Sequence, residues 1–185
     1  SPRYLDTVKS FALINTGFLG TVKDGVLNMY DGDLRMMYQD GSFEDFKPQD
    51  YLDHIREHVE GWTYLKFPYA KKAKDFSMDL DAASGIYRTN ALARVNVCDR
   101  IATPKAQAEL EEFRSNFGRP AQQTLLYHWA RLIETVYAAE RMKELFDDAD
   151  ILNPKTRVAV SPRAARGLTA TLVFGFRISA SSNNS

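Results

Sequence analysis

The sequence predicts an α+β fold that is mainly α-helical, in which a small antiparallel β-meander is followed by long packed helices. Asp-Gly pairs at 31–32 and 40–41 lie between short apolar or aromatic runs, which is typical of tight β-hairpin turns. Two later segments, 104–117 and 120–146, repeat apolar residues at helical spacing. These patterns place strands in the first third of the chain and a helix pair in its second half.

The composition limits the classes of protein that the chain can represent. Its 185 residues are 44% hydrophobic and 26% charged, which suits one domain or one lobe of a larger protein. Basic and acidic residues both number 24, so the overall charge favours neither nucleic acid nor an anionic membrane as a partner. No apolar run reaches the roughly 18–20 residues of a membrane span, and the first residues lack a signal-peptide pattern. We therefore expect a cytoplasmic protein.

The first 60 residues are expected to form a helix end, a loop, the meander and a second helix. Residues 1–10 have helical character, and Gly17 and Gly20 interrupt the apolar run that follows, which indicates a loop. The meander strands are expected near 26–30, 33–38 and 42–46. Pro48 then suits the start of a helix, one side of which carries Tyr51, Leu52, Ile55 and Val59.

This predicted helix contains the pattern H-x-x-E-H, formed by His54, Glu57 and His58. On a helix the two histidines would share a face and could bind zinc, with Glu57 activating water and a distant Glu134 as a third ligand. The same residue types also occur on ordinary solvent-exposed helices. A zinc hydrolase therefore stands beside the simpler interpretation of an exposed helix face.

The middle of the chain begins with the aromatic segment 62–69. Four of its eight residues are aromatic, and Pro68 favours extended backbone before it, so we expect an extended segment that packs on the core or on a partner. A polar loop follows, and then 85–98 should be irregular and afterwards helical. Cys98 is the only cysteine, which excludes an internal disulfide bond, and it is expected to be a buried or idle thiol rather than a nucleophile.

Two helices are predicted next, and they should pack as an antiparallel pair. Thr103 suits the N-cap of the first helix, Pro104 its first position and Gly118 its end. The second helix is expected to begin at Pro120 and to end soon after Phe146, where acidic residues oppose the helix dipole. It carries a dense polar group within two turns, which indicates a surface or a partner-facing edge: Tyr127, His128, Arg131 and Glu134.

The end of the chain has little regular pattern. Turns are expected at Asn153-Pro154 and Ser161-Pro162, a strand at 169–178, and disorder in the last residues. We therefore divide the chain into a main domain at 1–160 and a divergent, poorly ordered tail at 161–185.

Several segments, taken in order, resemble the middle portion of the large subunit of nickel–iron hydrogenases. They are MYDGDLR, YLDHIREHVEGWTYLKFPYAKK, GIYRTNALARVNVCDRIATPKAQAELEEF, LLYHWARLIETVYAAERMKEL and DADILNPKTRV. The resemblance covers roughly residues 10–160 and is closest to the cytoplasmic branch that works with NAD-linked or other soluble electron acceptors. It implies a partial large-subunit fold, and it weakens the zinc interpretation because DHIREHVEGW looks like a routine stretch of that family.

The resemblance also implies what this chain lacks. In that family a nickel–iron centre is held by four cysteine thiolates, from an R-x-C-G-x-C type motif near the N-terminus and a D-P-C-x-x-C type motif near the C-terminus. Neither motif is present, and the residues after Ser161 resemble only the lead-in to the family's E-A-P-R-G-T-L type segment. The chain is therefore expected to be a fragment, truncated at both ends, with no catalytic residue and no metal ligand of its own. No cofactor is expected in this fragment.

The matched positions that remain are expected to support a metal pocket or the surface toward an iron–sulfur small subunit. The candidates are Tyr64, Lys66, Arg94, His128, Arg131 and Glu134. The parent reaction would be reversible oxidation of H2, with electrons leaving through the small subunit. The alternative is a non-catalytic interaction protein that retains the fold. In either case apolar faces should be exposed around 62–69 and on the long helix.

Overall fold

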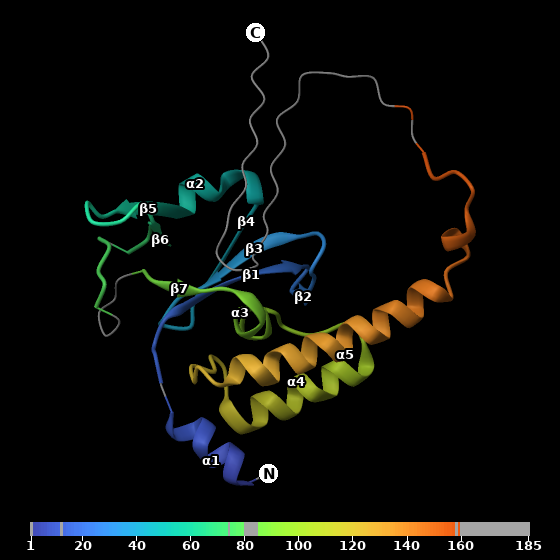
Figure 1. Ribbon diagram of the computed structural model, residues 1–185, viewed down its shortest axis with the longest axis horizontal. Coiled ribbons are helices and arrows are strands. Elements are labelled where there is room, and N and C mark those ends of the chain that lie inside the picture. The colour runs from blue at the N-terminus through green and yellow to red at the C-terminus, as the bar shows by residue number, and fades with distance from the viewer. Residues whose placement is uncertain (1, 12, 74, 80–84, 158, 160–185) are drawn as a thin grey trace.

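The computed structural model describes residues 2–11, 13–73, 75–79, 85–157 and 159 (Figure 1). Its helices are α1 (Pro2–Ser10), α2 (Tyr51–His54), α3 (Asn90–Val97), α4 (Pro104–Phe117) and α5 (Leu126–Phe146), with single 3-10 turns at Pro48–Asp50 and Ala149–Leu152. Its strands are β1 (Gly17–Lys23), β2 (Val26–Leu27), β3 (Asp33–Met37), β4 (Phe43–Phe46), β5 (Ile55–Val59), β6 (Lys66–Ala70) and β7 (Tyr87–Arg88). The expected α+β class is confirmed, whereas the whole of 161–185, including the predicted strand and tail, lies outside the described residues.

The main sheet has the strand order β2-β1-β3-β4, and β7 pairs in parallel with β1. The strands predicted near 33–38 and 42–46 are confirmed, and the one near 26–30 is shortened to two residues. The loop predicted around Gly17 and Gly20 is wrong, because this segment is β1, the central strand of the sheet. The strand is buried on both faces, so its side chains do not alternate between apolar and polar as those of a half-exposed strand do.

One glycine in β1 has a packing function. An added Cβ at Gly20 would lie 2.6 Å from Cγ2 of Val97 and 3.3 Å from Cα of Arg94. Gly20 therefore marks the point where α3 crosses the sheet at close backbone approach.

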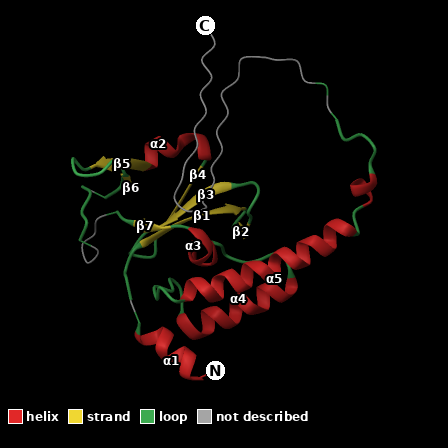
Figure 2. Ribbon diagram, viewed as in Figure 1, coloured by secondary structure: helices red, strands yellow, loops and turns green. Residues whose placement is uncertain are grey.

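Helix α3 lies between the sheet and the helix pair α4–α5, as Figure 2 shows. Six of its eight residues are buried, and the five apolar ones among them join the larger of two apolar clusters, together with Phe18, Leu110 and Ile133 from the neighbouring layers. The second cluster lies on the other face of the sheet, where Leu19, Met36 and Phe46 meet. The irregular-then-helical prediction for 85–98 is confirmed.

The helix pair α4–α5 is antiparallel, as predicted. Trp129 near the start of α5 contacts Phe113 and Phe117 near the end of α4, with ring centroids 5.8 Å apart in both cases. At the other end, the carboxylate of Glu140 accepts hydrogen bonds from the backbone N–H groups of Lys105 and Ala106. Thr103 occupies the N-cap position as predicted but makes no side-chain capping bond, so a glutamate from the neighbouring helix caps α4 instead.

The predicted start of the second long helix at Pro120 is wrong, because α5 begins at Leu126. The side chain of the buried Asn96 holds the backbone of Ala121 on both sides: Nδ2 donates to its carbonyl at 3.1 Å and Oδ1 accepts from its N–H at 2.8 Å. These bonds use backbone groups that a helix would need, so a long-range contact overrides the local signal from the proline. The predicted end after Phe146 is confirmed.

The helix predicted from Pro48 through Val59 is also wrong in its second half. Only a 3-10 turn and the four residues of α2 are helical, and from Ile55 the chain forms β5, which pairs antiparallel with β6. The extended form predicted for 62–69 is confirmed in its second part by β6. The two strands form a separate hairpin beside the main sheet.

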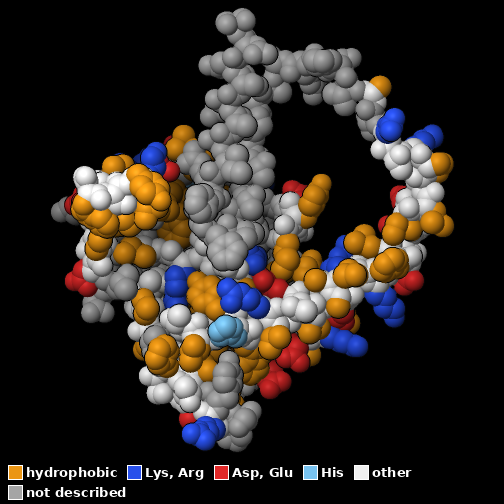
Figure 3. All heavy atoms as spheres, viewed as in Figure 1, with side chains coloured by type: hydrophobic (Ala, Val, Ile, Leu, Met, Phe, Trp, Pro, Cys, Tyr) orange, Lys and Arg blue, Asp and Glu red, His pale blue; other side chains and the backbone are white. Residues whose placement is uncertain are grey.

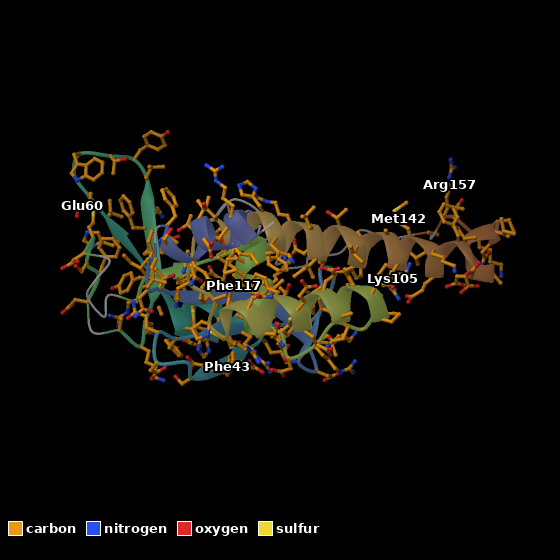
Figure 4. All side chains as sticks on the ribbon, turned by 90° about the horizontal axis from the view of Figure 1, so that it is seen from below. Phe43, Glu60, Lys105, Phe117, Met142 and Arg157 are labelled. Atoms are coloured by element: carbon orange, nitrogen blue, oxygen red, sulfur yellow. The ribbon has the colours of Figure 1, made fainter. Side chains whose placement is uncertain are left out.

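The expected exposed apolar faces are present in two places. Trp62 and Tyr64, in the turn of the hairpin, are 70% and 94% exposed, and Phe146 at the end of α5 is 70% exposed. Figure 4 shows Met142 on the side of α5 that points away from α4, and α5 continues past the start of α4 near Lys105. Both surfaces therefore offer apolar area for contact with another polypeptide.

We predict that Gly20→Ala will destabilise the fold by about 1–3 kcal/mol, because the new methyl group would lie 2.6 Å from Cγ2 of the branched Val97 side chain and 3.3 Å from Cα of Arg94. Gly61→Ala is the matched control, since an added Cβ there meets nothing within 4 Å. Urea denaturation of both variants measures the difference. Equal stability of the two would show that α3 does not pack closely on β1.

Candidate functional site

The best-formed polar cluster lies where α3 meets α5. The guanidinium group of Arg94 binds the carboxylate of Glu134 through two bonds, Nε to Oε1 at 2.5 Å and a terminal nitrogen to Oε2 at 2.9 Å. Only 11% of the Arg94 side chain and 12% of the Glu134 side chain are exposed. A bidentate, largely buried ion pair of this kind fixes the relative position of the two helices.

The start of α3 completes the cluster on one side. Asn90 has a positive φ of 75°, and its Oδ1 accepts from the N–H of Ala91 at 2.7 Å and from Arg94 at 3.4 Å. Asparagine tolerates this left-handed conformation better than most residues. The Arg94 side chain is therefore held between its own helix start and Glu134.

The first turns of α5 complete it on the other side. The hydroxyl of Tyr127 donates to the carbonyl of Thr89 at 3.0 Å, and the guanidinium of Arg131 lies 5.9 Å from the centre of the Tyr127 ring. Burial raises the pKa of Tyr127, and nearby guanidinium groups oppose that rise. His128 and Arg131 are both exposed. Of the six candidates from the sequence, the structure thus brings three together, Arg94, Arg131 and Glu134, while His128 lies exposed in the first turns of α5.

The other two candidates lie elsewhere. Tyr64 is in the turn of the β5–β6 hairpin and is almost fully exposed, and Lys66 binds the carboxylate of Glu57 at 3.0 Å on the surface of the same hairpin. Neither residue contacts the cluster between α3 and α5. Their position suits a docking surface better than the support of a pocket.

Arg88, which the sequence patterns did not single out, ties β7 to the segments around Thr16 and Gln122. Its guanidinium donates to Thr16 Oγ1 at 2.8 Å, to the carbonyls of Ile14 and Gln122 at 2.9 and 3.0 Å, and to the Gln122 side chain, and it stacks over Phe18. Burial lowers the pKa of Arg88. All these acceptors are neutral and distant in sequence, so no local pattern marks this residue.

The opposite end of α3 is held by three arginines from three parts of the chain. Arg114 donates to the carbonyls of Val95, Cys98 and Asp99, Arg119 to those of Asn96 and Val97, and Arg35 to that of Val97. Arg35 and Arg119 also bind the Asp99 carboxylate, and Arg35 binds Asp45. The last carbonyls of the helix, which have no partner within it, are satisfied in this way.

Cys98 lies at this end and is fully buried. Burial raises the pKa of its thiol to about 11, although the nearby Arg114 opposes the shift. The expectation of a buried, unreactive thiol agrees with this environment. Within the described residues, no three His, Cys, Asp or Glu side chains come together as a metal site would require.

The geometry assumed for the H-x-x-E-H pattern is wrong, because the helix ends at His54 and the following residues are a strand. His54 instead contacts Glu44 at 3.0 Å and stacks on Phe46, while His58 contacts Glu60 at 2.9 Å. The two histidines thus have separate acidic partners and do not share a helical face. This arrangement does not provide the inverted zincin site.

Comparison with known proteins places most of the chain beside hydrogenase subunits. No protein-family model matches it. It is 44% identical over 167 residues to one subunit of the vhu F420-non-reducing hydrogenase of Methanococcus voltae, covering 90% of this chain and 38% of that protein. It is 38% identical to the beta subunit of the NAD-reducing hydrogenase HoxS of Cupriavidus necator, covering 78% of this chain and 28% of that one.

The fold gives the same result. The crystal structure of an NAD+-reducing [NiFe]-hydrogenase in the H2-reduced state matches with a TM-score of 0.70 and 31% identity, over 88% of this chain and 35% of that chain. The chain therefore spans well under half the length of the proteins it resembles. Among the described residues, no helix is both long and apolar enough to cross a membrane.

We predict that Glu134→Leu will lower the free energy of unfolding by about 3–5 kcal/mol, since it leaves the Arg94 charge buried without its partner. The double variant Arg94→Met/Glu134→Leu should regain most of this loss. Arg141→Gln, which removes a surface pair with Glu144 on the same helix, should change stability by about 0–1 kcal/mol. Additive effects in the double variant would contradict a coupled pair.

The Cys98 environment predicts slow reaction with a thiol reagent at pH 8 in the folded protein and labelling of one thiol per chain after unfolding. Folding raises the pKa of the Cys98 thiol. The protonated thiol therefore contributes its full stabilising effect below the unfolded pKa of about 8.5, and this contribution is lost as the pH rises toward about 11. With a coloured aromatic disulfide as the reagent, the absorbance of the thiolate that the reagent releases measures the rate of labelling. Rapid labelling of the native protein would show that the α3–α4 junction is open.

Proposed function

We propose that this chain is a segment of the large subunit of a nickel–iron hydrogenase, corresponding to the central part of that subunit. The proposal rests chiefly on one observation: sequence similarity to a hydrogenase subunit covers 90% of the chain, and similarity of fold to a hydrogenase structure covers 88% of it. A short motif could match by chance, whereas an ordered match of this length together with the fold could not easily do so. In the complete subunit the reaction would be reversible oxidation of H2.

The residues of this chain do not fit a nickel–iron centre bound by four thiolates. Cys98 is the only cysteine in the sequence, and it is buried against Arg114 with its pKa raised by that burial. In this proposal the cysteine pairs belong to the parts of the large subunit on either side of the segment. The segment alone would therefore be inactive.

What the segment contributes is a rigid support. The Arg94–Glu134 pair joins α3 to α5, and Arg88 joins β7 to the segments around Thr16 and Gln122, through charged and neutral hydrogen bonds that are largely shielded from water. Such buried networks restrict a structure to one arrangement when all members have partners. We assign to Arg94 and Glu134 the role of positioning residues, and to the exposed His128 and Arg131 a place on a surface that other polypeptide covers.

The partner in this proposal is an iron–sulfur small subunit that receives the electrons, and the location is the cytoplasm. A second candidate function is a non-catalytic interaction protein that keeps the fold. It is supported by the exposed apolar side chains of the hairpin turn and of the far end of α5. The two functions differ in whether the segment can work inside an active subunit.

A chimera separates these alternatives. The matching 167-residue segment of the Methanococcus voltae hydrogenase is replaced by the corresponding residues of this chain and produced with its own partner subunits. We expect nickel binding and H2-dependent dye reduction within about tenfold of the unmodified enzyme. The same chimera carrying Glu134→Leu should lose most of both. A chimera that assembles with its partners but binds no nickel would contradict the proposal and favour the interaction protein.

A further inference from the structure

We propose that the outer face of α5 binds an acidic, amphipathic α-helix of another polypeptide. The centre of this face is a seam of five exposed residues that are spaced three and four positions apart, so that they lie on one side of the helix. They are Leu132, Thr135, Ala139, Met142 and Phe146. Figure 3 looks onto α5 and shows apolar side chains along it toward its far end.

The first argument is the exposure of the large apolar side chains in the seam. Leu132, Met142 and Phe146 are 65%, 57% and 70% exposed. The opposite side of α5 carries three fully buried residues that belong to the larger apolar cluster. A helix that packs on one side only is normally polar on the other side. The seam therefore indicates a second contact surface.

The second argument is the alternation of side-chain size along the seam. The small Thr135 and Ala139 lie between the larger Leu132 and Met142. The hydroxyl of Thr135 donates to the carbonyl of Arg131 at 2.8 Å, so its polar group is satisfied within the helix. Small side chains between large ones let the backbone of a second helix approach closely, with its own side chains packed between the large ones. This shape favours a helix as the occupant.

The third argument is the charge beside the seam. All three acidic residues of α5 have partners elsewhere: Glu134 binds Arg94, Glu140 caps α4 and Glu144 binds Arg141. None of these carboxylates is therefore available to balance a basic side chain next to the seam.

Arg131 and Lys143 flank the seam, one position before Leu132 and one position after Met142. Among the residues that the structure describes, neither of them forms an ion pair, so the rim of the seam is basic. Charges at these flanking positions select the partner of a packed helix. Acidic side chains on the incoming helix would meet both of them.

A second copy of this chain is a poorer occupant. In a parallel pairing of two α5 helices each basic residue would face itself, and in an antiparallel pairing Arg131 would face Lys143 of the other copy. Like charges oppose both arrangements. The source of the acidic helix rests on the proposed function: the chain covers 38% of its Methanococcus voltae relative, and we assign the helix to the part of the large subunit that lies outside this chain.

The test uses two synthetic helical peptides and the whole 185-residue chain. Both peptides are about three heptads long with leucine at the seam positions, and they carry either glutamate or lysine at the flanking positions. Fluorescence anisotropy of the labelled peptides measures binding. We expect the glutamate peptide to bind with a Kd on the order of 10–100 µM, and the lysine peptide to bind at least about tenfold more weakly.

Two variants separate helix packing from general adhesion. Ala139→Phe should weaken binding of the glutamate peptide about tenfold, because the bulky ring keeps the second helix away. Stronger binding by this variant would show that exposed apolar area alone attracts the peptide, and would overturn the proposal. The double variant Arg131→Gln/Lys143→Gln should weaken the same complex about fivefold. Arg3→Gln/Lys9→Gln, which removes the same charge from exposed residues of α1, should leave the Kd unchanged.

Three other results would overturn the proposal. Equal weakening by the two double variants would reflect net charge alone. A dimer of the chain that Ala139→Phe dissociates, measured by sedimentation, would make a second copy the occupant. Binding to phosphatidylglycerol vesicles that Arg131→Gln/Lys143→Gln abolishes would assign the face to a membrane surface.

The source of the helix is tested in the chimera with a photoreactive amino acid in place of Met142. Cross-links to the Methanococcus voltae part of the same subunit support the assignment, and cross-links to another subunit contradict it. The same label in place of Glu144, on the opposite side of α5, is the control. If the peptides bind as expected while the chimera holds no nickel, the proposed function fails and the face stands. A chimera that binds nickel, with a chain that binds neither peptide, keeps the function and overturns the face.

Discussion

The burial of α3 is the constraint on which the rest of this structure depends. A helix of eight residues is too short to be stable in water, so its stability must come from the layers on both sides. Gly20 lets it approach the sheet, and Leu110 and Ile133 from the helix pair pack in the same cluster. Burial also removes water from both helix ends, whose free backbone groups then need side-chain partners. Many of the buried polar side chains of the described residues provide these partners.

The two ends of α3 meet this need in different ways, and the difference connects fold to function. At the C-terminal end, arginines from β3, α4 and the following loop satisfy the carbonyls, and aspartates pair with two of them, Arg35 and Arg119. That end is closed and contains the inert Cys98. At the N-terminal end, Arg94 and Glu134 lock α3 to α5, while Arg88 and Arg131 remain without acidic partners among the described residues. In the proposed hydrogenase large subunit, this end would face the remaining polypeptide.

Local signals in the sequence predict the parts of the fold that depend on neighbouring residues. Pro104 and Gly118 mark the ends of α4 correctly because capping and helix termination are decided within a few residues. The same kind of signal places the start of α5 too early, because the distant Asn96 holds Ala121 out of the helix. Likewise, the loop predicted in place of β1 is wrong because Gly20 is needed for contact with a helix far along the chain. Family resemblance points to Arg94 and Glu134. Arg88 has only neutral partners that are distant in sequence, so neither local patterns nor the resemblance singled it out.

The packing implies that α3 is the most stable element and that stability falls along α5 once it extends beyond α4. Native-state hydrogen exchange of the whole chain measures this residue by residue. We predict that the amides of Val95, Val97 and Cys98 exchange only through global unfolding, whereas those from Arg141 to Phe146 open locally with a much smaller free energy. Exchange of the α3 amides as fast as those at the end of α5 would contradict it.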